Sequence, residues 1–299
     1  MNEIQFGVFL VPEASDGNEL RKKVRVAEAA GFDYVSIQDH PYVPRFLDTF
    51  TLIAHLAALT ERLRFMPNVA NLPLRPAPML AKASATIDLL SGGRFELGLG
   101  GGRAWNEIAG LGGPRWSPAE VVAATAEAID TIRMIWQSNR ILDQPSGHYP
   151  LAGAHSGPTP AHQIGIWLGA ARPRMLDLLG RKADGWVAPL STGFEENQPA
   201  QDRIDAAATA AGRRPTDIRR VIQLVGSVSD APGPATRPRS GPGNQPIRTT
   251  PEGWAQIIAE FATEERFDTV NLIPQLETVD QIERFATAVI PRVREALAT

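Results

Sequence analysis

Residues 81–102 read AKASATIDLLSGGRFELGLGGG, and this stretch decides the fold. Its first part has the apolar spacing of a helix that begins a few residues earlier. We expect the buried face of that helix to consist of Met79, Leu80, Ala83, Ile87 and Leu90. Gly92 and Gly93 end the helix, and Arg94–Leu99 then alternates in polarity as a strand does. A helix, a glycine-rich turn and a strand form one repeat of an α/β fold.

The same alternation extends in both directions along the chain. The pattern predicts strands at Ile4–Val11, Asp33–Ile37, Leu63–Val69, Arg94–Leu99, Ile164–Leu168, Gly185–Val187, Ile218–Val228 and Thr269–Pro274. Helices are predicted between and after them, at Glu19–Ala30, Asp48–Thr60, 79–91, 118–137, Pro173–Arg181, Phe194–Ala211, Pro251–Glu264 and Val279–Leu297. The crossovers are long enough for parallel strands. The count of eight units and the absence of a second composition zone in 299 residues favour a closed (β/α)8 TIM barrel. An open doubly wound sheet is the alternative.

Two segments interrupt the alternation. Residues 138–163 have no clear period, and residues 229–250 are rich in Pro, Gly, Arg and Ser. We interpret both as insertions into a single domain that spans residues 1–299. The second follows the seventh predicted strand, so we expect it to border the entrance of a site at that end of the barrel.

Two helix starts have the spacing of a capping box, in which a small polar side chain and an acidic residue three positions later bond to each other's backbone N–H groups. Asp16 with Glu19 and Ser117 with Glu120 fit this spacing. We therefore expect a capping box at the start of both helices.

The composition excludes several classes of function. The chain has no cysteine, which rules out disulfides, thiol nucleophiles and thiolate metal sites. Its net charge is −3 and its basic residues are scattered, which argues against nucleic acid as a partner. Met1–Leu10 does not resemble a signal peptide and no apolar run is long enough to span a membrane, so we expect a cytoplasmic protein without a membrane partner. No metal is expected, because metal-ligand spacing is absent among His55, His148, His155 and His162.

In α/β barrels the functional site forms from loops at the C-terminal ends of the strands. His40 follows the second predicted strand, and its imidazole could move a proton near neutral pH. It could also be a surface histidine beside a helix-capping Asp39. Gly100 and Gly101 follow the fourth strand, where they could let the backbone approach a flat ring or could only let the chain turn.

Two further positions in these loops have a functional and a structural interpretation. Gly169, Ala170 and Ala171 precede a helix, so their N–H groups could hold a phosphate or could only permit close packing. Arg103 could pair with a substrate carboxylate or a cofactor phosphate, or it could remain a solvated loop residue. The residues alone leave these alternatives open.

Three stretches resemble the luciferase-like monooxygenase superfamily: residues 81–102, GIWLGA at 165–170 and GRKADGW at 180–186. The similarity extends over essentially the whole chain and implies a TIM-barrel oxidoreductase that uses reduced FMN or the deazaflavin coenzyme F420. The pair Asp39-His40 is similar to the F420-dependent branch, in which the histidine sits against the reactive face of the ring.

The resemblance also implies where the cofactor lies. A cis peptide often supports the ring in this superfamily, and it would map near Asn68-Val69. Cofactor phosphates would lie on the loop and helix after the fifth strand. The residues that would surround the cofactor are Asp39, His40, Asn68, Val69, Gly100, Gly101, Arg103, Asn106, Gly169, Ala170 and Ala171. One position departs from the sugar-phosphate dehydrogenase branch, which has a glutamate, proposed as an acid, where this chain has Arg103.

The function expected from these observations is hydride transfer between coenzyme F420 and a small organic substrate. His40 would handle the proton or position the ring, and Asp39 would hold His40. An FMN-dependent monooxygenase that uses oxygen is the alternative, and a non-catalytic flavin-binding barrel is a second one. We further expect the protein to be a homodimer.

Overall fold

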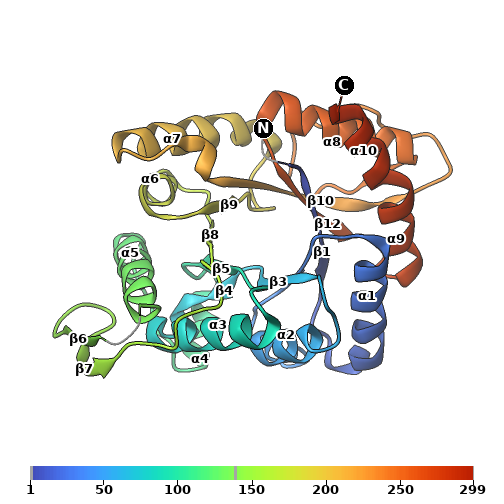
Figure 1. Cartoon of the computed structure of the whole chain (residues 1–299). Helices are drawn as coiled ribbons and strands as arrows, with labels where there is room; N and C mark the ends of the chain where they lie inside the picture. Colours follow the sequence, from blue (N-terminus) through green and yellow to red (C-terminus); the bar gives the residue numbers. More distant parts are fainter. Residues whose placement is uncertain (1–2, 138–139, 299) are drawn as a thin grey trace.

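The computed structural model describes residues 3–137 and 140–298 as a barrel of parallel strands surrounded by helices (Figure 1). Its strands follow the order β3-β2-β1-β12-β10-β9-β8-β5-β4. Their bounds are β1 Gln5–Leu10, β2 Tyr34–Ile37, β3 Arg64–Pro67, β4 Ala70–Asn71, β5 Leu97–Gly100, β8 Ile166–Gly169, β9 Gly185–Val187, β10 Arg219–Val228, β11 Ile247–Thr249 and β12 Thr269–Pro274. Strand β11 pairs with β10.

The two ends of this strand order meet, so the barrel is closed. Phe65 of β3 forms a parallel bridge with Phe95, just before β5. Strand β4 follows β3 in the chain and pairs with the end of β5, placing Ala70 opposite Leu99. The predicted (β/α)8 TIM barrel is therefore confirmed, with β4 as a short continuation of the third barrel strand.

The helices connect the strands on the outside of the barrel (Figure 1). Their bounds are α1 Gly17–Ala30, α2 Thr49–Ala57, α3 Ala77–Ser91, α4 Trp105–Gly110, α5 Pro118–Ile135, α6 Pro173–Lys182, α7 Asn197–Ala210, α8 Pro251–Glu265, α9 Val279–Arg284 and α10 Ile290–Ala298. A π-helical turn, Phe285–Val289, joins α9 to α10. Within the ranges that the structure describes, no helix combines the length and apolar character needed to cross a membrane.

One of the two predicted capping boxes forms. At the start of α5, Ser117 accepts a hydrogen bond from the Glu120 N–H, and Glu120 accepts one from the Ser117 N–H. At the start of α1 the prediction is wrong, because Asp16 makes no side-chain capping bond. Asp16 ends a short 3₁₀ turn there, and Glu19 pairs with Lys22 instead.

The buried face of α3 also differs from the prediction. Met79 and Leu90 are 64% and 81% exposed. The helix packs inward through a row made largely of small residues, Leu80, Ala81, Ser84, Ala85, Ile87 and Asp88. Small side chains let the helix approach the barrel closely, and the wide apolar stripe in the sequence therefore splits between a buried and an exposed face.

The interior of the barrel has an apolar layer below a polar layer. Tyr34, Met66, Trp167, Val187 and Val221 form the apolar cluster. Because side chains alternate along a strand, the residues two positions further on also point inward. On β2, β10 and β12 the polar layer carries Ser36, Gln223 and Asn271, all of them buried. The polar layer lies toward the C-terminal ends of the strands.

The first insertion contains an antiparallel hairpin, β6 Ile141–Gln144 and β7 Leu151–His155. It lies at the periphery beside α5 (Figure 1). Glu127 of α5 attaches the hairpin turn, because its carboxylate accepts hydrogen bonds from the N–H groups of His148 and Tyr149, both at 2.8 Å. Residues 138 and 139 lie outside the described ranges.

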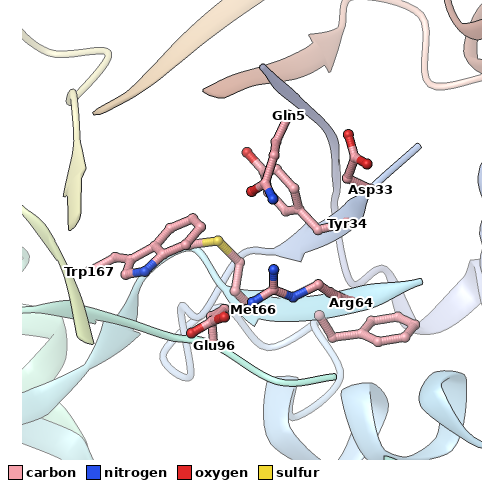
Figure 2. A pocket seen from close by; sticks show the side chains of 8 residues that line it. Gln5, Asp33, Tyr34, Arg64, Met66, Glu96 and Trp167 are labelled. Atoms are coloured by element: carbon pink, nitrogen blue, oxygen red, sulfur yellow. Dashed lines mark ion pairs between the residues drawn. The ribbon is translucent and has the colours of Figure 1, made fainter. Parts of the chain in front are cut away.

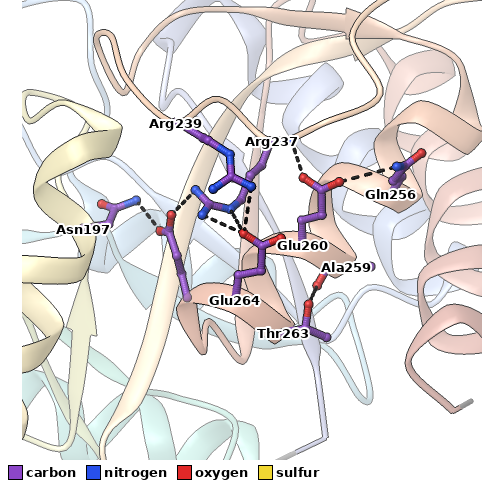
Figure 3. Close-up of polar contacts among 9 residues, drawn as sticks. Asn197, Arg237, Arg239, Gln256, Ala259, Glu260, Thr263 and Glu264 are labelled. Atoms are coloured by element: carbon purple, nitrogen blue, oxygen red, sulfur yellow. Dashed lines mark hydrogen bonds and ion pairs between the residues drawn. The ribbon is translucent and has the colours of Figure 1, made fainter.

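The second insertion is attached to α8, which bonds in turn to α7 (Figure 3). The Arg237 guanidinium pairs with Glu264 at 2.9 Å and also with Glu265, which in turn accepts a 3.0 Å hydrogen bond from Asn197. Glu264 and Glu265 end α8 just before β12 begins, at the N-terminal end of the barrel. The expectation that the whole segment borders the site entrance is therefore wrong for its middle part.

Candidate active site

His40 lies at the C-terminal end of β2, where its position is fixed from two sides. Its ring stacks on Tyr42, with centroids 5.3 Å apart and planes 19° apart. The Gln38 side-chain amide bonds to His40 Nδ1 at 2.7 Å. Burial lowers the pKa of His40 below its ordinary 6.5; Asp39 opposes this shift and Arg103 adds to it. The imidazole is therefore mostly neutral at pH 7.

Asp39 does not hold His40, and this part of the prediction is wrong. Its carboxylate is 1% exposed and forms a bidentate ion pair with the Arg75 guanidinium, with both N–O distances at 2.8 Å. It also accepts a 2.9 Å hydrogen bond from the Asn71 N–H. Asp39 and His40 are neighbours in the chain, but their side chains point in different directions after the strand. The Asp39 carboxylate points toward the loop after β4.

The peptide between Asn68 and Val69 is cis, as predicted. The Val69 side chain lies across the ends of β5 and β8. A methyl group added at Gly100 would lie 2.6 Å from Cγ2 of Val69, and one added at Gly169 would lie 3.3 Å away. Both glycines therefore make room for Val69, which is a structural reason for their presence at the barrel mouth.

Hydrogen-bonded amides line the C-terminal end of the barrel interior next to Val69. Asn68 Nδ2 donates to Gln223 Oε1 at 2.7 Å, and Gln223 Nε2 donates to the Ala188 carbonyl at 2.9 Å. Ser36 donates to Asn271 Oδ1 at 3.1 Å. The sequence reasoning missed Ser36, Gln223 and Asn271, and also Gln38. The available signal was a polar residue inside an otherwise apolar strand, as in VIQLV and TVNLI.

The loop after β5 places its residues differently. A methyl group at Gly101 would lie 2.6 Å from Val121 of α5, so this glycine permits close packing against that helix. Arg103 is exposed, and its guanidinium forms no ion pair or hydrogen bond with the residues that the structure describes. Asn106 is exposed on α4, and no side-chain hydrogen bond joins it to the other candidate residues in the described ranges.

The loop after β8 leads directly into α6. The Ala170 carbonyl accepts a 2.9 Å hydrogen bond from the Trp186 indole, so this peptide is held firmly against β9. Ala171 is half-buried, and Arg172 and Arg174 are exposed at the start of α6. The structure thus brings His40 and Val69 together with the glycine ends of β5 and β8 at one mouth of the barrel.

A small pocket occurs at the opposite mouth, at the N-terminal ends of the strands (Figure 2). Gln5, Asp33, Tyr34, Arg64, Glu96 and Trp167 are among the residues that line it. Arg64 pairs with Glu96, and the Gly165 N–H donates to Glu96 at 2.6 Å. Polar groups at this end of α/β barrels serve stability, so we do not place the active site there. Among the described residues, no group of three His, Cys, Asp or Glu side chains could hold a metal ion.

A closed parallel barrel with polar side chains gathered at its C-terminal mouth has the architecture of α/β-barrel enzymes. The model of the luciferase-like monooxygenase family matches residues 4–268, and the chain belongs to this family. The resemblance identified in the sequence is thereby confirmed.

Three similar proteins give the family relationship more detail. Phthiodiolone/phenolphthiodiolone dimycocerosates ketoreductase of Mycobacterium tuberculosis is 34% identical over 187 residues, 60% of this chain and 47% of the relative. The alignment thus spans about half the length of that relative. The F420-dependent glucose-6-phosphate dehydrogenase of Mycolicibacterium fortuitum is 29% identical over 283 residues, 91% of this chain and 82% of the relative. The F420-dependent tetrahydromethanopterin reductase of Methanopyrus kandleri shares the fold, with a TM-score of 0.81, 18% identity and coverage of 97% and 99%.

Proposed function

We propose that this chain is an oxidoreductase that transfers a hydride between coenzyme F420 and a small organic substrate. The observation that carries the proposal is His40, a half-buried imidazole held by Gln38 and Tyr42 at the catalytic end of the barrel. The dehydrogenase relative that aligns with 91% of the chain is named as F420-dependent, which supports the choice of cofactor. We further propose that the enzyme is cytoplasmic and has no nucleic acid or membrane partner.

The donor set at the mouth fits a flat ring with polar edges. Val69 offers an apolar surface, and the amides of Gln38 and Asn68 offer donors and acceptors beside it. Arg172 and Arg174 follow the loop Gly169–Ala171 and form no ion pairs in the described ranges, which suits an anionic cofactor tail. When bound, a deazaflavin supplies two-electron hydride chemistry.

His40 can serve either direction of proton transfer at the substrate. Nδ1 is bonded to Gln38, and Nε2 has no protein partner among residues 3–137 and 140–298. The Gln38 amide can donate from its NH2 group to an unprotonated Nδ1. After rotation, its carbonyl can accept a hydrogen bond from a protonated Nδ1. Nε2 can therefore accept a proton or hold one. The lowered pKa keeps the ring available as a base at neutral pH.

Titration of the protein with F420 and with FMN, followed by ring fluorescence, tests the cofactor. We expect tight binding of F420 and weak binding of FMN. Oxygen consumption then tests the reaction, because hydride transfer proceeds equally well under nitrogen. Tight binding of FMN alone, together with substrate-dependent oxygen uptake, would replace the proposal by the monooxygenase alternative. Cofactor binding without turnover across a broad substrate panel would favour a non-catalytic binding protein.

We also propose that the protein is a homodimer that associates through α3. Met79, Leu89 and Leu90 are 64%, 45% and 81% exposed on this helix. Large apolar side chains grouped on one exposed helix are typical of a protein–protein interface. A second copy of the chain would cover them.

A further inference from the structure

Arg103 carries a charge at the C-terminal mouth that no carboxylate in the described part of the chain neutralises. Arg75 and Arg237, by contrast, are each held by two carboxylates. Arg103 is exposed directly after the glycine end of β5, and Glu107, one helical turn further along, forms no ion pair with it. A guanidinium left unpaired at a catalytic mouth is available to an anionic ligand.

The charge of Arg103 acts on the two stacked rings of the site. It contributes to the lowered pKa of His40, after burial, and it opposes the rise in the pKa of Tyr42 that burial and Glu107 cause. Arg103 and the His40–Tyr42 pair follow β5 and β2 of the same barrel, so both lie at its C-terminal mouth.

The backbone of this loop is well defined around Arg103. Gly102 has φ +95°, which only glycine adopts readily, and the Trp105 N–H donates to the Arg103 carbonyl at 3.1 Å. The Trp105 ring packs edge-on against Trp116, with centroids 6.5 Å apart. A cation beside aromatic side chains suits a ligand with an apolar body and one anionic group.

We propose that Arg103 determines specificity by pairing with a carboxylate of the substrate beside His40, an inference that rests on the proposed function. The substrates are then small organic acids whose reacting carbon lies near the imidazole. A phosphate of the cofactor is also an anion and would pair with the Arg103 guanidinium in the same way. We favour the substrate because Arg103 and His40 share the C-terminal mouth and the charge of Arg103 acts on the His40 ring. Arg172 and Arg174, by contrast, stand beside the loop where a phosphate is expected.

The test uses phenylacetate as the anionic probe and phenylacetamide as its neutral counterpart, added to the full chain without cofactor. Proton NMR of the His40 ring gives its pKa. We expect phenylacetate to raise the pKa of His40, because a bound anion offsets the charge of Arg103, and phenylacetamide to leave it unchanged. Arg103→Gln should remove this response and weaken phenylacetate binding about tenfold or more. Arg115→Gln, which replaces an exposed arginine between α4 and α5, should behave as the wild type.

Equal binding of phenylacetate to the wild type and Arg103→Gln would overturn the inference. A second titration distinguishes the two sources of the anion, using F420 and its phosphate-free deazaflavin nucleoside. If Arg103→Gln weakens only F420, the anion is the cofactor phosphate and the inference is overturned; equal affinities in both proteins support it. If the wild type binds neither cofactor, the proposed function fails, and the phenylacetate titration still decides the role of Arg103.

Discussion

The environment of His40 predicts both its protonation state and the effect of removing it. His40→Ala should lower turnover about 100-fold to 10,000-fold while changing F420 affinity little, because its proposed task is proton transfer. His40→Gln, which keeps a hydrogen-bonding group without a titratable one, should show a similar loss. Steady-state kinetics and fluorescence titration measure the two effects. Unchanged turnover in His40→Ala would return this histidine to a structural role.

The pH dependence follows from the lowered pKa of His40. A buried imidazole favours its neutral form, so the base is present at pH 7 and is lost only as the pH falls through a pKa below 6.5. The rate of substrate oxidation should therefore decline on the acidic side, below pH 6.5. Arg103→Gln should move this decline to higher pH, since Arg103 helps to lower the pKa. A decline that persists unchanged in His40→Gln would assign it to another group.

Asp39 is expected to matter for stability more than for proton transfer. Asp39→Asn leaves Arg75 without its buried partner, and breaking such a pair costs about 3–5 kcal/mol in the free energy of unfolding. Because Asp48 also pairs with Arg75, we expect the loss in the free energy of unfolding to lie near the lower end of this range. Urea denaturation measures it. Asp130→Asn, which breaks an exposed pair with Lys182, should cost less than about 1 kcal/mol. Similar losses in both variants would contradict the buried-pair interpretation.

At the scale of the elements, Val69 joins the ends of β3, β5 and β8. Gly100→Ala should displace Val69 and weaken F420 binding, because the added methyl group would lie 2.6 Å from Cγ2 of Val69. The double variant Gly100→Ala with Val69→Ala should recover part of the affinity by removing the clash. Gly17→Ala, where nothing lies within 4 Å, serves as the control. If the loss of F420 binding free energy in the double variant equals the sum of the losses in both single variants, Gly100 and Val69 act independently.

Much of this element structure could be predicted from the sequence, and the errors have physical reasons. Period and glycine stops located the barrel strands to within a few residues, because burial imposes the period directly. The buried face of α3 could not be predicted, because apolar side chains on the exposed face have the same spacing. The role of Asp39 was missed because its partner Arg75 lies in another loop, and only tertiary structure brings them together. Ser36 and Gln223 were overlooked because a single polar residue in an apolar strand has little weight in a periodic pattern.

At the scale of the whole molecule, the exposed face of α3 predicts the oligomeric state. Leu90→Asp should convert the proposed dimer into a monomer, because a buried unpaired carboxylate at an interface is costly. Light scattering coupled to gel filtration measures the mass. Leu276→Asp, at a residue that is 63% exposed outside α3, should leave the dimer intact. A Leu90→Asp protein that stays dimeric would move the interface elsewhere.

The pairing of β1 with β12 has a consequence for how the chain reaches its native state. Gln5 lies opposite Thr269, so one neighbour of the first strand is synthesised only after almost the entire chain. Until then β1 can pair with β2 alone, and its other edge stays open to non-native strands. Closing so large a loop is slow, and the barrel can be completed only late in translation or after release from the ribosome. A nascent chain halted before β12 should therefore be highly sensitive to protease and prone to aggregate, although most of its core residues are already present.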